Sequence, residues 1–454
     1  MSRRRPPSTT RSNLRLISGD GAAFAVMVGV GEANLVAFGL ALGISQATAG
    51  LLATVPMVAG GALQLIAPWG VRRMGSHKRW CQLCVIGQSL SFAPLILAAF
   101  IGFIPTPLLF LTAAFYWASG MGAGPAWNTW VGTLIPERIR APYFARRTRL
   151  TQASVFLGLM AGGIALERWT ALGQRHLGFA MLFLLALLCR AISLVLVTRQ
   201  TEPIPIAPTL RSVPLREMAR KIRHGQDGRI LLYLLGMQVA VQTAGPFFTP
   251  YMLEQLHFSY VQFVSIPAMA YVAKIAALPL LGRWAQRHGA VHLMTWGALG
   301  IVPLSALWVV ADSFWYLLAV QIISGFCWGA LELAVLLVFF ETIHADERTS
   351  ILTMFNFANT CAVIAGSLIG HAVLSGLGES PSAYLALFWG SAILRIVPLP
   401  LLRGIRELKG RSVPVATRTD ALRPSAGSID RPLLPSLPAE PPLQEDSVSP
   451  GPTS

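Results

Sequence analysis

About twelve stretches of roughly 20 mostly apolar residues fill the 454-residue chain, and this feature constrains its fold more than any other. A helix of that length spans the hydrocarbon core of a bilayer, which is about 30 Å thick. Inside hydrocarbon, every backbone polar group must find its hydrogen-bond partner within the chain, and a helix achieves this locally. The sequence therefore predicts an all-α integral membrane protein with about twelve transmembrane helices.

The predicted spans form two sets of six, separated by a polar stretch. The first set is Ala22–Leu42, Ala49–Ala67, Leu83–Ile104, Leu108–Ile135, Leu150–Leu166 and Leu177–Thr198. The second set is Ile230–Met252, Tyr260–Leu281, Val291–Val310, Phe314–Phe340, Ile351–Leu377 and Ala383–Leu402. Prolines lie inside several of these spans, and membrane helices tolerate them.

The charges indicate how the chain lies in the membrane. Charged residues make up only 12% of the sequence, whereas soluble proteins carry about 25%. Of the 36 lysines and arginines, 31 lie in the two termini and in the loops of one side, and the opposite loops hold only Arg168 and Arg175. The positive-inside rule then predicts cytoplasmic termini and an even number of spans in the cytoplasmic (inner) membrane. The net charge of +16 therefore does not indicate a nucleic-acid partner.

Five segments follow from this pattern. Residues 1–21 form a basic cytoplasmic N-terminus, 22–198 a six-helix bundle, 199–229 a cytoplasmic loop and 230–403 a second six-helix bundle. Residues 404–454 are rich in Pro and Ser, so we expect a disordered cytoplasmic tail.

The two bundles repeat each other. Pro56 in the second span corresponds to Pro267 in the eighth, and Arg190 in the sixth span corresponds to Arg395 in the twelfth. Several such matches in the same order indicate a duplication. Internal repeats of this kind are typical of secondary transporters, which bind their substrate between the halves.

The loop between the second and third spans, "PWGVRRMGSHKR", and its counterpart "GRWAQRHG" resemble the loop motif of the major facilitator superfamily. The matching positions are Arg73, Gly75, Lys78 and Arg79 in the first copy, and Gly282, Arg287 and Gly289 in the second. Both copies depart from the motif, because Arg72 and Gln286 stand where the family has an acidic residue. The resemblance covers roughly residues 18–405. It implies a major facilitator fold, transport by alternating access, and a central cavity lined by spans 1, 4, 7 and 10.

The stretch "GPAWNTWVGTLIPERIRAPYFARRTR" resembles that of bacterial members with no assigned substrate. The antiporter signature of the fifth span and the sugar-transporter signature after the sixth are both absent. The resemblance therefore assigns no substrate. We expect no cofactor and no metal site, and a monomer that binds a small-molecule substrate and protons within the lipid bilayer.

Glu32 is an acid near the middle of the first span. It lies roughly 15 Å from each surface at helical rise, where a charge costs at least about 2.5–3.5 kcal/mol. An unpaired carboxylate at that depth holds its proton near neutral pH and can release it when water gains access. Glu32 is therefore a candidate proton site, and the alternative is a static ion pair or a protonated, hydrogen-bonded side chain.

Two further charges lie deep in the second bundle. Lys274 in the eighth span and Glu332 in the tenth could form a structural ion pair, or Lys274 could hold an anionic group of the substrate. Arg190 and Arg395 occupy duplicated positions near the inner ends of their spans. This favours a structural role for both, such as binding helix carbonyls.

Other polar and aromatic side chains complete the candidate substrate site. Trp117 in the fourth span and Trp328 in the tenth could form an aromatic wall, and Asn128 is a polar candidate in the fourth span. Gln238 and Gln242 are one helical turn apart in the seventh span and present two amides on one face.

The sequence thus predicts a proton-coupled secondary transporter of a small organic solute. A drug or secondary-metabolite exporter is an alternative within that class. A non-transporting membrane receptor or scaffold that signals through its tail is the alternative from another class. No nucleophile–base pair or phosphate-binding loop indicates an enzyme, and the Cys81–Cys84 pair lacks the second pair that a zinc site requires.

Overall fold

The computed structural model describes residues 7–202, 226–342 and 345–403. Within these ranges the chain is helical and contains no β-strand, which confirms the all-α prediction. The expected disordered tail and most of the central loop lie outside the described residues.

The N-terminal half consists of the long helices of spans 1 to 6 and their breaks. Its elements are α1 (Pro7–Val30), the 3-10 helix η1 (Glu32–Asn34), α2 (Leu35–Ala41), α3 (Gln46–Leu52), α4 (Met57–Met74), α5 (His77–Leu90), α6 (Phe92–Ile101), α7 (Thr106–Leu134), α8 (Glu137–Ala171) and α9 (Arg175–Arg199).

The C-terminal half repeats this order. Its elements are α11 (Gln226–Ala244), the 3-10 helix η2 (Gly245–Phe247), α12 (Phe248–Pro250), the π-helical η3 (Tyr251–Gln255), α13 (Tyr260–His288), α14 (Ala290–Ile301), α15 (Leu304–Leu307), α16 (Phe314–Thr342), α17 (Ala345–Leu377), α18 (Pro381–Ile396) and η4 (Leu399–Leu402).

Eleven helical segments of the described chain are long and apolar enough to cross a membrane. The predicted fourth span, α7, is not among them, although it is a continuous helix of 29 residues packed against α4 and α5. Its second half, "GMGAGPAWNTW", carries glycines, tryptophans and an asparagine that lower the hydropathy. α7 is therefore a helix of spanning length whose composition is less apolar than that of its neighbours.

Several helices extend beyond the predicted boundaries toward the basic side, and α1 and α8 extend furthest. α1 begins at Pro7, well before the predicted start at Ala22, and α8 includes residues 137–149, which the sequence assigned to a loop. Both extensions carry apolar residues that join one hydrophobic cluster, among them Ile17 of α1 and Phe144 of α8. The second extension also contains five arginines, two alanines and one glutamate, which favour helix.

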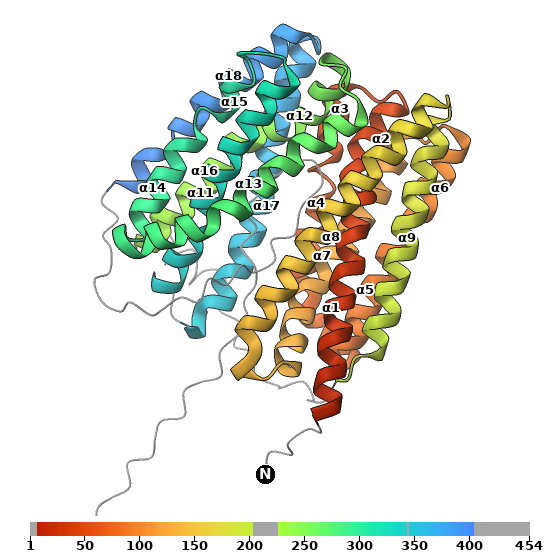
Figure 1. Ribbon diagram of the computed structural model, residues 1–454, viewed down its shortest axis with the longest axis vertical. Coiled ribbons are helices and arrows are strands. Elements are labelled where there is room, and N and C mark those ends of the chain that lie inside the picture. The colour runs from red at the N-terminus through yellow and green to blue at the C-terminus, as the bar shows by residue number, and fades with distance from the viewer. Residues whose placement is uncertain (1–6, 203–225, 343–344, 404–454) are drawn as a thin grey trace, which may run out of the picture.

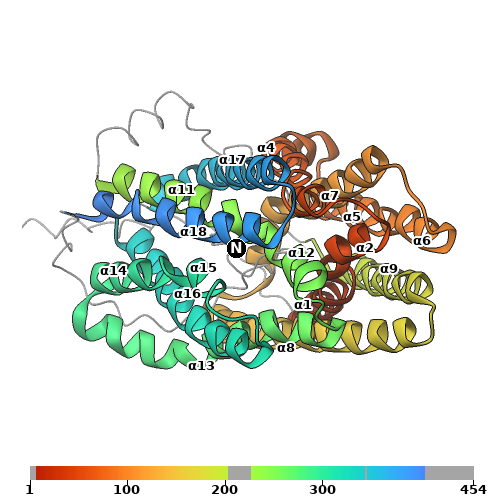
Figure 2. The same cartoon turned by 90° about the horizontal axis from the view of Figure 1, so that it is seen from above.

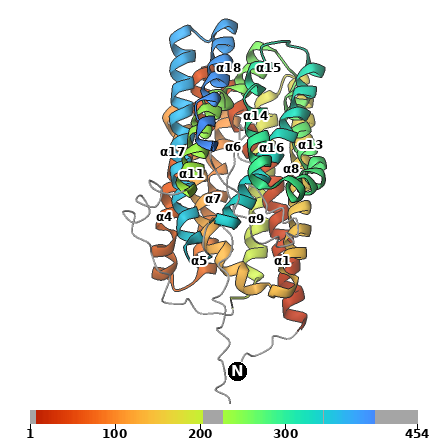
Figure 3. The same ribbon diagram turned by 90° about the vertical axis from the view of Figure 1, so that its left-hand side faces the viewer.

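The two halves lie side by side with their helices along the long axis of the molecule (Figures 1 and 3). They approach each other at the end formed by Ala41–Gly50, Glu167–Arg175, Gly245–Tyr260 and Glu379–Tyr384, which we call the closed end. Seen along the axis, α17 lies beside α4, and α13 beside α8 (Figure 2). The halves diverge toward the opposite end, where α1 begins (Figure 1). We call this the open end.

Spans 1 and 7 are both interrupted near the middle. In span 1 the α-helix ends at Val30 and resumes at Leu35, with η1 between; in span 7 η2 separates α11 from α12. The two breaks occupy corresponding places in the two halves, which agrees with the duplication seen in the sequence. Interrupted membrane helices are common at the binding sites of transporters.

Candidate functional site

Glu32 lies in the break of span 1, at the first position of η1. Its side chain is 2% exposed, so it does not face the lipid. The Tyr116 hydroxyl of α7 donates a hydrogen bond to its carboxylate at 2.5 Å. Tyr116 in turn packs edge-to-face against Trp117, with ring centroids 5.7 Å apart. Glu32 is thus an acid buried between the helices of spans 1 and 4.

Lys274 of α13 and Glu332 of α16 form an ion pair in the C-terminal half. The Lys274 ammonium lies 3.1 Å from both carboxylate oxygens of Glu332, and the two side chains are 11% and 9% exposed. The ammonium also lies 5.4 Å from the ring centre of Tyr271. Of the two alternatives for Lys274, the described geometry corresponds to an ion pair with Glu332.

Removing one partner of this pair is expected to be costly. In Lys274→Met the Glu332 carboxylate stays buried without its cation, which destabilises the fold by about 3–5 kcal/mol. The double variant Lys274→Met/Glu332→Leu removes both charges and is expected to recover most of that loss. Thermal unfolding of the purified variants measures both effects.

The double variant also separates the two roles of Lys274. If the pair is structural, the stable double variant keeps the activity of the unmodified protein. A double variant that folds well but is inactive contradicts this assignment and indicates that Lys274 contacts the ligand.

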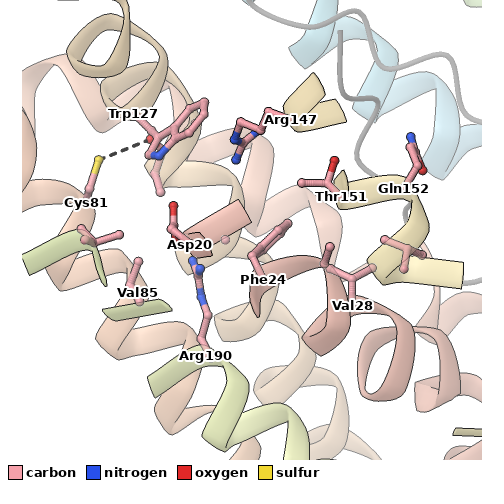
Figure 4. Close-up of a pocket in the computed structure, with 16 residues that line it drawn as sticks. Asp20, Phe24, Val28, Cys81, Val85, Trp127, Arg147, Thr151, Gln152 and Arg190 are labelled. Carbon is pink, nitrogen blue, oxygen red and sulfur yellow. Dashed lines mark hydrogen bonds between the residues drawn. The ribbon is translucent and has the colours of Figure 1, made fainter. Parts of the chain in front are cut away.

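A cavity of about 210 Å³ lies within the N-terminal half, among α1, α5, α7, α8 and α9. Three charged residues line it: Asp20, Arg147 and Arg190. Ser193 links two of them, because it accepts a hydrogen bond from Arg190 at 2.8 Å and donates one to Asp20 at 2.5 Å. Figure 4 shows Asp20 between Trp127 and the Arg190 guanidinium.

The duplicated arginines have different partners. Arg395 is 1% exposed and donates to the backbone carbonyl of Ile301 in α14 at 2.8 Å, a contact of the structural kind expected from the sequence. Arg190 lines the cavity and lies 4.9 Å from the ring centre of Phe24. Two residues for which the duplication predicts one role thus have different surroundings in the structure.

Most of the other candidate substrate residues are buried between helices. Trp117, Trp328, Gln238 and Gln242 are each at most 1% exposed, and Asn128 is partly exposed. Within the described chain, neither the Gln238 amide nor the Trp328 indole nitrogen has a hydrogen-bond partner. None of these five lines the cavity around Asp20.

The loop motif residues lie at the open end. Gly75 ends α4 with a left-handed φ of +65°, and Gly289 follows α13 with a φ of +88°. Glycine adopts such angles without steric cost, so both residues end their helices in tight turns. Arg73 and Arg287 are exposed, whereas Gly282 lies inside α13.

Polar contacts hold the closed end together. Glu379, between α17 and α18, accepts hydrogen bonds from the backbone N–H groups of Gln46 and Ala47 at 3.1 and 2.9 Å. These N–H groups begin α3 and have no partner within that helix. The Gln46 side chain accepts further hydrogen bonds from Gln255 and Tyr384 at 3.0 and 2.9 Å.

An apolar contact lies beside this network. Phe247 of η2 is fully buried between a glycine of each half. A Cβ atom added to Gly50 of α3 would lie 2.3 Å from the Phe247 ring, and one added to Gly370 of α17 would lie 2.4 Å from it. The ring therefore fits only because both positions lack a side chain.

Three residues that matter here could not be identified as site residues from the sequence. Asp20 falls just outside the predicted first span, and only its position directly before the apolar run signals a buried acid. Tyr116 has no distinguishing signal, because an aromatic residue in a membrane helix is common. Glu379 lies in a short loop, and its partners become visible only once the halves are placed together.

Comparisons with known proteins bear on the same architecture. The sequence model of the Major Facilitator Superfamily matches residues 230–433. No curated protein sequence matches the chain.

Three solved structures illustrate the structural likeness. The nucleoside transporter NupG has a TM-score of 0.67 and 12% identity, over 87% of this chain and 99% of that one. A bacterial homolog of the human lysosomal transporter Spinster, solved inward-facing and unoccupied, has a TM-score of 0.60 and 16% identity, over 88% and 95%. A POT family transporter in complex with 5-aminolevulinic acid has a TM-score of 0.62 and 16% identity, over 87% and 97%. At such identities the likeness concerns the fold.

Proposed function

We propose that the chain is a member of the major facilitator superfamily, whose sequence model matches its residues 230–433, and that it is a secondary active transporter that moves a small organic solute across the cytoplasmic membrane by alternating access. The observation that carries this proposal is the contact between the halves at the closed end and their divergence toward the open end (Figure 1). Two bundles arranged in this way can rock about a midplane site.

The orientation of the charges supports an inward-facing state. The start of α1 and the last turn of α4, which carries Arg72 and Arg73, lie at the open end, and the positive-inside rule assigns that end to the cytoplasm. The closed end then faces outward, and the described conformation is open to the cytoplasm.

We further propose that transport is coupled to protons through Glu32. Three features support this: the side chain is buried, it lies in the break of span 1, and it accepts a hydrogen bond from Tyr116 of span 4. Ionisable residues at such depth are functional in most membrane proteins.

The test is transport by the purified protein in liposomes that contain a pH-sensitive dye. Adding a transported solute is expected to change the internal pH, whereas protein-free liposomes show no change. A library of metabolites and drugs that never produces a solute-dependent pH change contradicts proton coupling. A solute that accumulates without such a change contradicts only the role of the proton.

Truncation of the tail separates transport from the receptor alternative. Removing residues 411–454 leaves all described helices intact, so the solute-dependent pH change is expected to stay within about twofold of the full chain. A truncated protein that folds and no longer transports contradicts a tail-independent transporter. Thermal unfolding of the truncated protein is the control for folding.

A further inference from the structure

The cavity of about 210 Å³ in the N-terminal half has no role in the proton site at Glu32. All its walls come from α1, α5, α7, α8 and α9, so it does not depend on how the two halves meet. Asp20 and Arg190 are each 5% exposed, whereas Trp127, Arg147 and Gln152 are more accessible. The cavity therefore has a buried, charged floor and a more accessible rim.

The lining carries an excess of positive charge. Its three charged residues are two arginines, Arg147 and Arg190, and a single acid, Asp20. The charges of both arginines act on Asp20, and Ser193 bridges Asp20 to Arg190. One carboxylate cannot neutralise two guanidinium groups, so the empty cavity keeps a net charge of about +1.

The remaining lining is apolar and aromatic. Phe24, Val28 and Val85 form one part, and the Trp127 ring carries the Arg147 guanidinium 4.6 Å from its centre. Thr151 and Gln152 add two polar groups. The volume is below the roughly 300–1,000 Å³ of sites for drug-sized ligands, so it suits a compact molecule.

We propose that this cavity binds a small organic anion, with its carboxylate or phosphonate group between Arg147 and Arg190 and its apolar body against Trp127 and Phe24. Guanidinium groups bind such oxyanions through paired, charge-assisted hydrogen bonds. The inference adds a ligand site within the N-terminal half to the proposed transporter and rests on that proposal for any role in transport. Binding itself can be measured without flux.

Asp20 acts as an internal competitor in this arrangement. Its carboxylate interacts electrostatically with the same two arginines that the ligand is proposed to bind. Replacing it with Asn removes the competing charge and keeps the size of the side chain. An anion is then expected to bind more tightly, whereas a cation would bind less tightly.

The probes are benzoate and phenylphosphonate, with neutral benzamide and cationic benzamidine as matched controls of similar size. Each is added to the purified full-length protein in detergent, and the shift of its thermal unfolding midpoint gives the affinity. At least one of the two anions is expected to stabilise the protein in a saturable manner. Benzamide and benzamidine are expected to have no effect.

Three variants assign this binding to the cavity. Arg147→Gln is expected to weaken anion binding by about tenfold or more, because it removes a charged hydrogen-bond donor. Asp20→Asn is expected to tighten binding by about tenfold. Arg149→Gln removes the same charge from an exposed position two residues further along α8 and is expected to leave binding unchanged.

Specific outcomes overturn the inference. Stabilisation by neither anion, stabilisation by benzamidine as strong as that by the anions, or equal weakening in Arg147→Gln and Arg149→Gln each contradicts an anion site in this cavity. Arg147 is only partly buried, so its variant is informative even if Asp20→Asn fails to fold. Anion binding in a protein without transport activity would contradict the proposed function while leaving the site intact.

Discussion

Glu32→Gln is expected to abolish solute-dependent proton movement, reducing it to the level of protein-free liposomes. The Gln amide oxygen can still accept the hydrogen bond that Tyr116 donates to Glu32, so the local packing is kept. The amide cannot bind and release a proton in the physiological range, however, and the coupling step is lost. Because an acceptor replaces an acceptor, the stability is expected to change by less than about 1 kcal/mol.

The control for this variant is Glu254→Gln, which neutralises an exposed acid of η3. It is expected to keep the pH response of the unmodified protein. Unchanged proton-driven transport in Glu32→Gln would remove this residue from the mechanism. Loss of the response in both variants would show that the effect is not specific to Glu32.

The order and nature of the helices were predictable because each depends on local composition. A bilayer requires about 20 apolar residues per helix wherever the chain crosses it, so the spans are visible in the sequence. A count of apolar residues does not predict the parts of helices that extend beyond the hydrocarbon core. The basic extensions of α1 and α8 are polar enough to resemble loops, and they become helical because Ile17 and Phe144 find partners in a shared cluster.

The site was only partly predictable because side-chain partners depend on tertiary packing. Burial of Glu32 could be expected from its depth, but the Tyr116 hydroxyl lies 84 positions away in the chain. Lys274 and Glu332 were equally consistent with a pair or with separate roles, and the 3.1 Å contact across α13 and α16 depends on how these helices cross. Asp20 is buried in α1, but it precedes the apolar run, so the boundary that hydropathy sets for the first span excludes it.

Gly50→Ala is expected to shift the protein away from the conformation described here. The new methyl group would lie 2.3 Å from the Phe247 ring, and Gly370 on the other side leaves the ring no room to retreat. Overpacking of this kind costs about 1–3 kcal/mol, which lowers the population of the closed end by about one to two orders of magnitude. Alanine also favours helix over glycine, but that gain applies to both conformations and cancels.

The shift is measured as the distance between spin labels at Leu172 and Trp315, which are exposed and belong to different halves, after replacement of the exposed Cys361. We expect longer distances in Gly50→Ala and a matching loss of solute flux, because a transport cycle must pass through the closed-end conformation. Gly376→Ala is the matched control, since a Cβ there meets no atom within 4 Å. If the distances and the flux are the same in both variants, Phe247 can move aside and its contact with the two glycines does not gate transport.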